Sequence, residues 1–130
     1  MELYEKLRKM QILLIDDDEW IRDSMQLFFE SEGCPIKTLE TAEEGIKELE
    51  KNHYDIIISD YRLPGTDGLE FLEMTSGLYP QALRILITAY GNEQVISEAK
   101  RIGIQDFIEK PFTTKTIETS LSKLIETERR

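Results

Sequence analysis

Short apolar runs alternate with longer amphipathic stretches along the chain. Each run has the length of a strand, and apolar residues recur at helical spacing in the stretches between them. The runs cover residues 12–15, 36–39, 56–58, 85–87 and 107–108. Helices are predicted over residues 19–32, 42–52, 93–102 and 114–128, and Asp67-Gly68 predicts the start of one more. The pattern therefore predicts five strands that alternate with helices.

Strands that alternate with helices form βαβ units, which build a parallel sheet covered by helices on both faces. The runs at 12–15, 56–58 and 85–87 are wholly apolar, as is typical of central strands buried on both sides. The mixed run at 36–39 is typical of an edge strand. We therefore predict an α/β fold of three layers, a (βα)5 flavodoxin-like doubly wound parallel sheet with strand order 2-1-3-4-5.

A length of 130 residues fits one domain. We expect that domain to cover residues 10–128. Residues 1–9 form a leader, predicted as a short helix or a frayed terminus. No pair of DNA-binding helices and no enzymatic module follows the last predicted helix, so we expect no output domain in this chain.

The charge excludes some functions but identifies none. The chain has 16 Lys+Arg against 26 Asp+Glu, a formal net charge of −10. This balance argues against direct nucleic-acid binding and against docking on anionic lipid, which both need clustered basic residues. Cys34 is the single cysteine, and no apolar run approaches the roughly 20 residues of a membrane span. We expect a cytoplasmic protein.

Acidic, hydroxyl and amino groups stand at the ends of the predicted strands. In such sheets, ligands bind outside the carboxyl ends of the strands where the strand order reverses, here between the first and third strands. The strand-end residues are Asp16-Asp17-Asp18, Asp60, Thr88-Ala89 and Lys110-Pro111. Clustered carboxylates favour a hard cation such as Mg²⁺, and a carboxylate can attack phosphorus to form an aspartyl phosphate. The rim therefore predicts phosphoryl chemistry, which needs mainly positioning and charge neutralisation.

Four segments carry a resemblance to a known family. They are Leu14-Ile15-Asp16-Asp17-Asp18-Glu19, Ser59-Asp60-Tyr61-Arg62-Leu63-Pro64-Gly65-Thr66-Asp67-Gly68, Leu86-Ile87-Thr88-Ala89-Tyr90 and Phe107-Ile108-Glu109-Lys110-Pro111-Phe112. In this order and spacing the chain resembles the receiver domain of two-component response regulators over about residues 10 to 127.

The resemblance implies roles for the acids. Asp60 is similar to the aspartate that accepts the phosphoryl group. Asp17 resembles the direct Mg²⁺ ligand, Asp16 the acid that holds metal-bound water, and the main-chain carbonyl of Arg62 a further ligand. Lys110 resembles the lysine that pairs with the phosphoryl group.

The resemblance also implies a switch. Thr88 is similar to the hydroxyl that bonds the phosphoryl oxygen, with Ala89 leaving space beside it. Phe107 resembles the aromatic switch residue, and the bond to Pro111 is expected to be cis. The implied output face is formed by the fourth helix, fifth strand and fifth helix of the repeat. Three further residues are expected on or near it: Tyr90, Gly91 and Gln94.

The implied function is a phosphorylation-controlled switch. The phosphoryl group would come from a sensor histidine kinase or a phosphotransfer protein, and the output would be a downstream effector or an attached output domain. The domain would catalyse only its own phosphorylation and dephosphorylation and would not otherwise be an enzyme. A phosphorylation-dependent dimer is among the assemblies the resemblance allows.

Two alternatives stay open on the sequence alone. A haloacid-dehalogenase-like phosphohydrolase also starts with a strand that ends in Asp-x-Asp, which matches Asp16 and Asp18, and it would use Asp16 as its nucleophile. A pseudo-receiver would be a binding module that accepts no phosphate. The position of an acyl phosphate, on Asp60, on Asp16 or on neither, separates the three.

Overall fold

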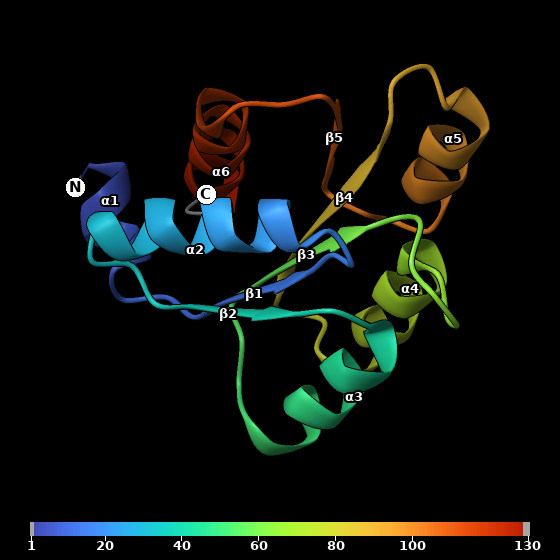
Figure 1. The fold of residues 1–130 in the computed structure, drawn as a ribbon, viewed down its shortest axis with the longest axis horizontal. Coiled ribbons are helices and arrows are strands. Elements are labelled where there is room, and N and C mark those ends of the chain that lie inside the picture. Colours follow the sequence, from blue (N-terminus) through green and yellow to red (C-terminus); the bar gives the residue numbers. More distant parts are fainter. Residues whose placement is uncertain (1, 129–130) are drawn as a thin grey trace.

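The computed structural model describes residues 2–128 and places helices on both sides of one sheet (Figure 1). The strands are β1 (Ile12–Ile15), β2 (Ile36–Leu39), β3 (Ile56–Asp60), β4 (Leu83–Ala89) and β5 (Asp106–Lys110). The helices are α1 (Leu3–Leu7), α2 (Glu19–Ser31), α3 (Ala42–Lys51), α4 (Gly68–Leu78), α5 (Glu93–Arg101) and α6 (Thr114–Glu128). None of the described helices has the length and apolar character needed to span a membrane.

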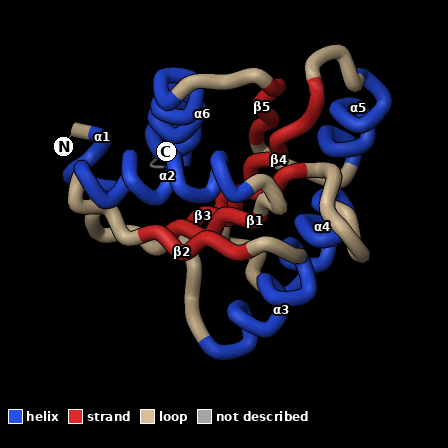
Figure 2. Tube along the Cα trace, in the orientation of Figure 1, coloured by secondary structure: helices blue, strands red, loops and turns tan. Residues whose placement is uncertain are grey.

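The sheet confirms the predicted topology (Figure 2). All its strand pairs are parallel and the order is β2-β1-β3-β4-β5, with the mixed strand β2 at one edge. Ile15 on β1 pairs with Ser59 on β3, so the residue after each, Asp16 and Asp60, emerges at the same rim. Ala89 on β4 pairs with Lys110 on β5, which brings the lysine to that rim as well.

Each face of the sheet carries its own core. Because side chains alternate along a strand, Leu14 packs beneath α2 and α6, whereas Leu13 packs beneath α3, α4 and α5. Every residue of β1 is fully buried, as the continuous apolar run predicts. The two cores hold the strand ends in fixed positions.

The apolar runs mark only the buried middle of the longer strands. β4 extends two residues beyond its run at each end, so Thr88 and Ala89 lie within the strand. β3 likewise continues to Asp60 and β5 to Lys110. The polar end residues thereby share the rigidity of the sheet.

Side-chain caps begin the helices where the sequence predicts them. The Asp18 carboxylate accepts from the amides of Trp20 and Ile21 at the start of α2. The Asp67 carboxylate caps α4 by accepting from the Glu70 amide at 2.8 Å. These caps supply partners to first-turn N–H groups that have none inside the helix.

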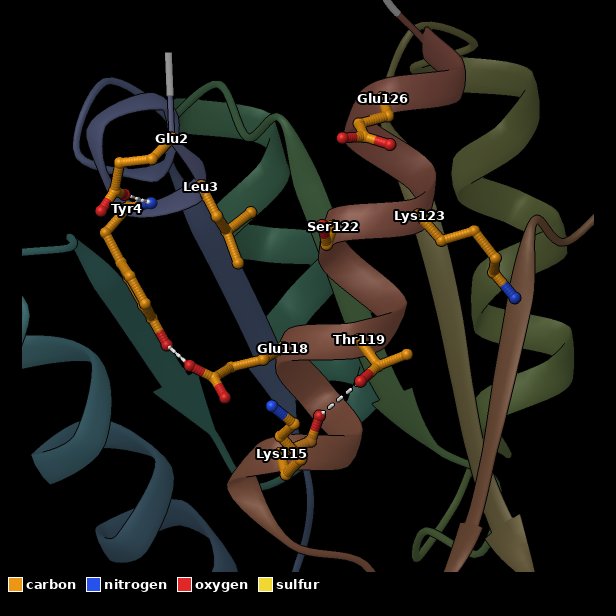
Figure 3. Close-up of a pocket in the computed structure, with 9 residues that line it drawn as sticks. All are labelled: Glu2, Leu3, Tyr4, Lys115, Glu118, Thr119, Ser122, Lys123 and Glu126. Atoms are coloured by element: carbon orange, nitrogen blue, oxygen red, sulfur yellow. Dashed lines mark hydrogen bonds between the residues drawn. The ribbon is translucent and has the colours of Figure 1, made fainter.

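The leader forms the short helix α1, which packs on the rest of the fold (Figure 3). Leu7 is fully buried in the core beneath α2 and α6. The Tyr4 hydroxyl donates to the Glu118 carboxylate on α6, and the Arg8 Nε donates to the Glu32 carbonyl at 2.8 Å. A hollow of about 700 Å³ lies between α1 and α6 beside the Tyr4–Glu118 contact.

One charged residue interrupts the apolar strand β4. Arg84 is 3% exposed, and its guanidinium donates to the carbonyls of Ala82, Thr75 and Tyr79 and to the Thr75 hydroxyl. Thr75 and Tyr79 lie at the carboxyl end of α4, where the partial negative charge of the helix dipole favours a cation. Burial lowers the pKa of the guanidinium. Arg84 therefore ties the end of α4 to the sheet.

We predict that Arg84→Lys lowers the free energy of unfolding by roughly 2–3 kcal/mol, because an ammonium cannot reproduce the planar fork of donors in a buried position. Urea unfolding measures the change. The matched control is Arg101→Lys, whose exposed side chain pairs with Glu98 on α5 and whose replacement changes stability by less than about 0.5 kcal/mol. Equal effects of the two substitutions would contradict the proposed role of Arg84.

Candidate functional site

Three carboxylates gather at the rim where the strand order reverses. Asp16 follows β1 and is fully buried, Asp60 ends β3 and is 5% exposed, and Asp17 is exposed. Each offers a carboxylate oxygen, and these oxygens lie within 4.8 Å of one another. Among the described residues this acidic triad could hold a metal ion.

Lys110 brings a positive charge to the triad from the edge strand β5. Its Nζ lies 3.3 Å from Asp60 Oδ2 and 3.7 Å from Asp16 Oδ2, and its side chain is 30% exposed. The lysine therefore bridges the two buried carboxylates from the solvent side.

The electrostatics of the rim oppose ionisation of the buried acids. The pKa of Asp60 is raised to about 6, because burial and then the charge of Asp16 raise it more than Lys110 lowers it. Burial also raises the pKa of Asp16, against a lowering by the Asp18 backbone amide and by Lys110. Two ionised carboxylates carry more negative charge than one lysine neutralises, so further positive charge would stabilise their ionised forms.

The donor set fits a divalent cation. Asp16 Oδ2 is a buried oxygen with no hydrogen-bond partner in the described part of the chain, so it has a free lone pair for a cation or its water. A hollow of about 500 Å³ lined by Asp17 and Arg62, among others, opens beside the triad. Hard oxygen donors in small number with room for water are the surroundings that Mg²⁺ prefers.

The loop after Asp60 folds back tightly against the strand end. The Tyr61 amide donates to the Ile87 carbonyl at 2.7 Å, and the Gly68 amide donates to the Tyr61 carbonyl at 2.8 Å. A Cβ on Gly68 would lie 1.9 Å from the Asp60 carbonyl oxygen, so only glycine allows α4 to begin there. The start of α4 is thereby fixed against the acid site.

The predicted switch residues lie on neighbouring strands but are not all in contact. Thr88 is 1% exposed, and its hydroxyl accepts from the Asn92 side-chain amide at 3.3 Å; among the described residues it makes no hydrogen bond with Asp60. Ala89 is exposed at the end of β4, and the Lys110–Pro111 peptide bond is cis. Phe107 is half-buried against the core beneath α3, α4 and α5, with Lys100 Nζ 5.3 Å from its ring centroid.

The residues expected on the output face lie at the start of α5. Tyr90 is 80% exposed, and Gly91 and Gln94 are exposed as well. Gly91 has a φ of +81°, and its amide donates to the Glu109 carboxylate on β5 at 2.8 Å. This hydrogen bond connects the β4–α5 turn to β5.

Two contacts of the site were not predicted from the sequence. Arg22 on α2 donates from Nη1 to the Asp16 carbonyl at 2.8 Å and so fixes the turn that carries the acid pair. Asn92 holds the Thr88 hydroxyl. The only sequence signal for Asn92 was its suitability as a helix cap, which indicates a different role.

The family assignment agrees with this geometry. The sequence model of the response regulator receiver domain family matches residues 12–122 of this chain. The chain belongs to this family. It is a receiver domain with an acidic pocket formed by Asp16, Asp17 and Asp60, beside Lys110.

Relatives and solved structures extend the comparison. The C4-dicarboxylate transport transcriptional regulatory protein DctD of Pseudomonas aeruginosa is 33% identical over 119 residues, which span 92% of this chain and 26% of DctD. The transcriptional regulatory protein FixJ of Bradyrhizobium diazoefficiens is 32% identical over 104 residues, 80% of this chain and 51% of FixJ. A CheY-like receiver domain protein of Methanospirillum hungatei matches with a TM-score of 0.86 at 27% identity, covering 92% of this chain and 96% of that one. The chain thus spans about a quarter of DctD and about half of FixJ.

We predict that, without divalent cations, Asp60→Asn is more stable than the wild type at neutral pH. The folded pKa of Asp60, about 6, lies above the ordinary value of 3.8, so the folded state binds this proton more tightly than the unfolded state. The resulting stabilisation is complete below the ordinary pKa and is lost as the pH rises through about 6. Thermal unfolding in EDTA should therefore show a variant advantage that grows from about pH 4 to pH 8, up to about 3 kcal/mol.

Asp23→Asn, which removes one exposed aspartate from α2, is the matched control for the change in net charge. An advantage of Asp60→Asn that stays constant across this pH range would contradict the assignment of the shift to Asp60.

Proposed function

We propose that this domain is a phosphoacceptor switch in which Asp60 receives a phosphoryl group from a sensor histidine kinase or a phosphotransfer protein. The observation that carries the proposal is the placement of Asp60, a carboxylate 5% exposed, beside two further acids and 3.3 Å from Lys110. Membership of the receiver family supports the same reading.

The chemistry requires one displacement at phosphorus. A carboxylate oxygen of Asp60 forms a bond to the phosphorus of a phosphohistidine, the N–P bond breaks, and the imidazole leaves with the electron pair. Lys110 Nζ stands where it can pair with the phosphoryl oxygens. Mg²⁺, when held by Asp16, Asp17 and the Arg62 carbonyl, would neutralise negative charge on the phosphoryl group. The sheet keeps the acids and the lysine in position throughout.

The relay would begin at Thr88. A phosphoryl group on Asp60 offers new acceptor oxygens at the rim, and the Thr88 hydroxyl on the neighbouring strand would turn to one of them, with Ala89 leaving room. Phe107, half-buried on β5, would then repack, and the domain would shift towards a second conformation. The output surface would be the face of α5, β5 and α6, with Tyr90, Gly91 and Gln94 at or before the start of α5.

The partners follow from the same proposal. DctD and FixJ are named as transcriptional regulatory proteins and are longer than the matched region, so an attached output domain or a separate effector would receive the signal here. Apart from forming and losing its own aspartyl phosphate, the domain would not act as an enzyme. A dimer that forms on phosphorylation is compatible with an exposed output face, and we place the protein in the cytoplasm.

Two observations weigh against the alternatives. A phosphohydrolase of the haloacid dehalogenase type would need Asp18 beside Asp16 in the site, but the Asp18 carboxylate caps α2 instead. A pseudo-receiver would lack part of the acid, hydroxyl and lysine set, whereas this chain has Asp60, Thr88 and Lys110 at one rim.

We predict that acetyl phosphate with Mg²⁺ labels the wild-type chain with an acid-labile, hydroxylamine-sensitive acyl phosphate and that Asp60→Asn reduces the label to background. Asp60 supplies the attacking oxygen, which an amide cannot replace. Intact-protein mass spectrometry measures the label, and borohydride reduction followed by peptide mapping locates it. Asp23→Asn is the control and should label like the wild type.

Label on Asp16 would support the phosphohydrolase, and no label on the wild type would support the pseudo-receiver. Full label on Asp60→Asn would overturn the proposed function.

A further inference from the structure

The side chain of Asn92 stands out because it does not perform the role its position offers. Asn92 is the N-cap residue of α5, and asparagine is among the best N-cap residues. Its side chain nevertheless makes no capping bond to the helix. The N-cap side chains of the four preceding helices all make such bonds: Glu2, Asp18, Thr41 and Asp67.

The amide of Asn92 is bonded to Thr88 instead. Its Nδ2 donates to Thr88 Oγ1 at 3.3 Å across the turn of residues 89–91. Thr88 is 1% exposed, so its hydroxyl depends on protein groups for hydrogen bonds. Asn92 is the single protein partner of this hydroxyl among the described residues.

We propose that Asn92 is a positioning residue that holds the Thr88 hydroxyl in the unphosphorylated state and exchanges this bond for the N-cap of α5 when Thr88 is drawn to a phosphoryl group. This inference rests on the proposed function and names the regulation of the same site. Asn92 acts only through Thr88 and touches no reacting atom.

The exchange conserves hydrogen bonds. In the first state the Asn92 amide nitrogen donates to Thr88, and the first-turn amides of α5 have no side-chain acceptor. In the second state the Thr88 hydroxyl bonds a phosphoryl oxygen, and the Asn92 amide oxygen accepts from the amides of Gln94 or Val95. A neutral hydrogen bond and an N-cap stabilise by similar amounts, so the two states lie close in free energy.

The surroundings permit the movement. Asn92 is half-buried, Tyr90 is 80% exposed, and Gly91 has the φ of +81° that a glycine adopts without strain. The main chain stays anchored on both sides of Asn92, because its own amide donates to the Ala89 carbonyl and its carbonyl accepts from the Ile96 amide. A rotation of the side chain is therefore enough to transfer the bond from Thr88 to α5.

The test compares affinities for a phosphoryl mimic, beryllium fluoride with Mg²⁺, in variants of the full chain. Asn92→Ser removes the amide that reaches Thr88 but keeps an N-cap residue. Loss of a bond present only in the unphosphorylated state should make the mimic bind about five-fold more tightly. Asn52→Ser, which removes an exposed asparagine amide at the carboxyl end of α3, is the matched control and should bind like the wild type.

Two further measurements separate positioning from a structural effect. In a Thr88→Val background, Asn92→Ser should no longer change the affinity, because the partner of the amide is absent. In the NMR spectrum of the wild type, the Asn92 side-chain amide signals should move in the same direction on addition of the mimic as they do in Thr88→Val without it.

The outcomes separate the role of Asn92 from the proposed function of the domain. If the wild type binds the mimic and Asn92→Ser binds it equally well, or if the affinity gain persists without Thr88, the role of Asn92 is wrong and the proposed function stands. If the wild type neither binds the mimic nor accepts phosphate on Asp60, both are wrong.

Discussion

The repulsion between two buried carboxylates is the constraint on which the site depends. Asp16 and Asp60 come from adjacent parallel strands, and both have raised pKa values because burial disfavours their charged forms. Like charges at such a separation are costly in a medium of low dielectric constant. Only a rigid support keeps them together, and the two cores of the sheet provide it. The site is therefore built to attract positive charge, and Lys110 supplies the first of it.

The strand order determines which elements lie near Asp60 and so near any change of charge there. Asp60 lies on β3 and Lys110 on β5, so the carboxyl end of β4 lies between them. Thr88 is at that end, and α5 follows within a few residues. Asp60 thus pairs with β4, the strand whose carboxyl end leads into α5. The path from the acid site to α5 is short because the intervening strand leads directly into that helix.

The sequence predicted the sheet and the acid site well because both depend on local patterns. Strand ends in a parallel sheet share one rim, so Asp60 and Lys110 could be placed together from topology alone. The roles of Arg84 and Asn92 could not be predicted in this way. Arg84 bonds carbonyls at the end of α4, and Asn92 bonds a side chain across a turn, so each role depends on the packed arrangement of main-chain and side-chain groups. The docking of α1 through Leu7 likewise depends on a core that residues distant in the sequence form together.

Helix α1 restricts the movement of α2 and α6 relative to each other. With Leu7 fully buried and Tyr4 bonded to Glu118, any shift of α2 against α6 would have to disrupt the contacts of α1. Helix α5 buries Val95 and Ala99, and unlike α2 its first turn has no side-chain cap. First-turn amides have no acceptor inside the helix, so a missing cap leaves the start of α5 less firmly held. The fold therefore combines helices α2 and α6, which the contacts of α1 hold together, with a helix α5 next to Thr88 whose first turn has no side-chain cap.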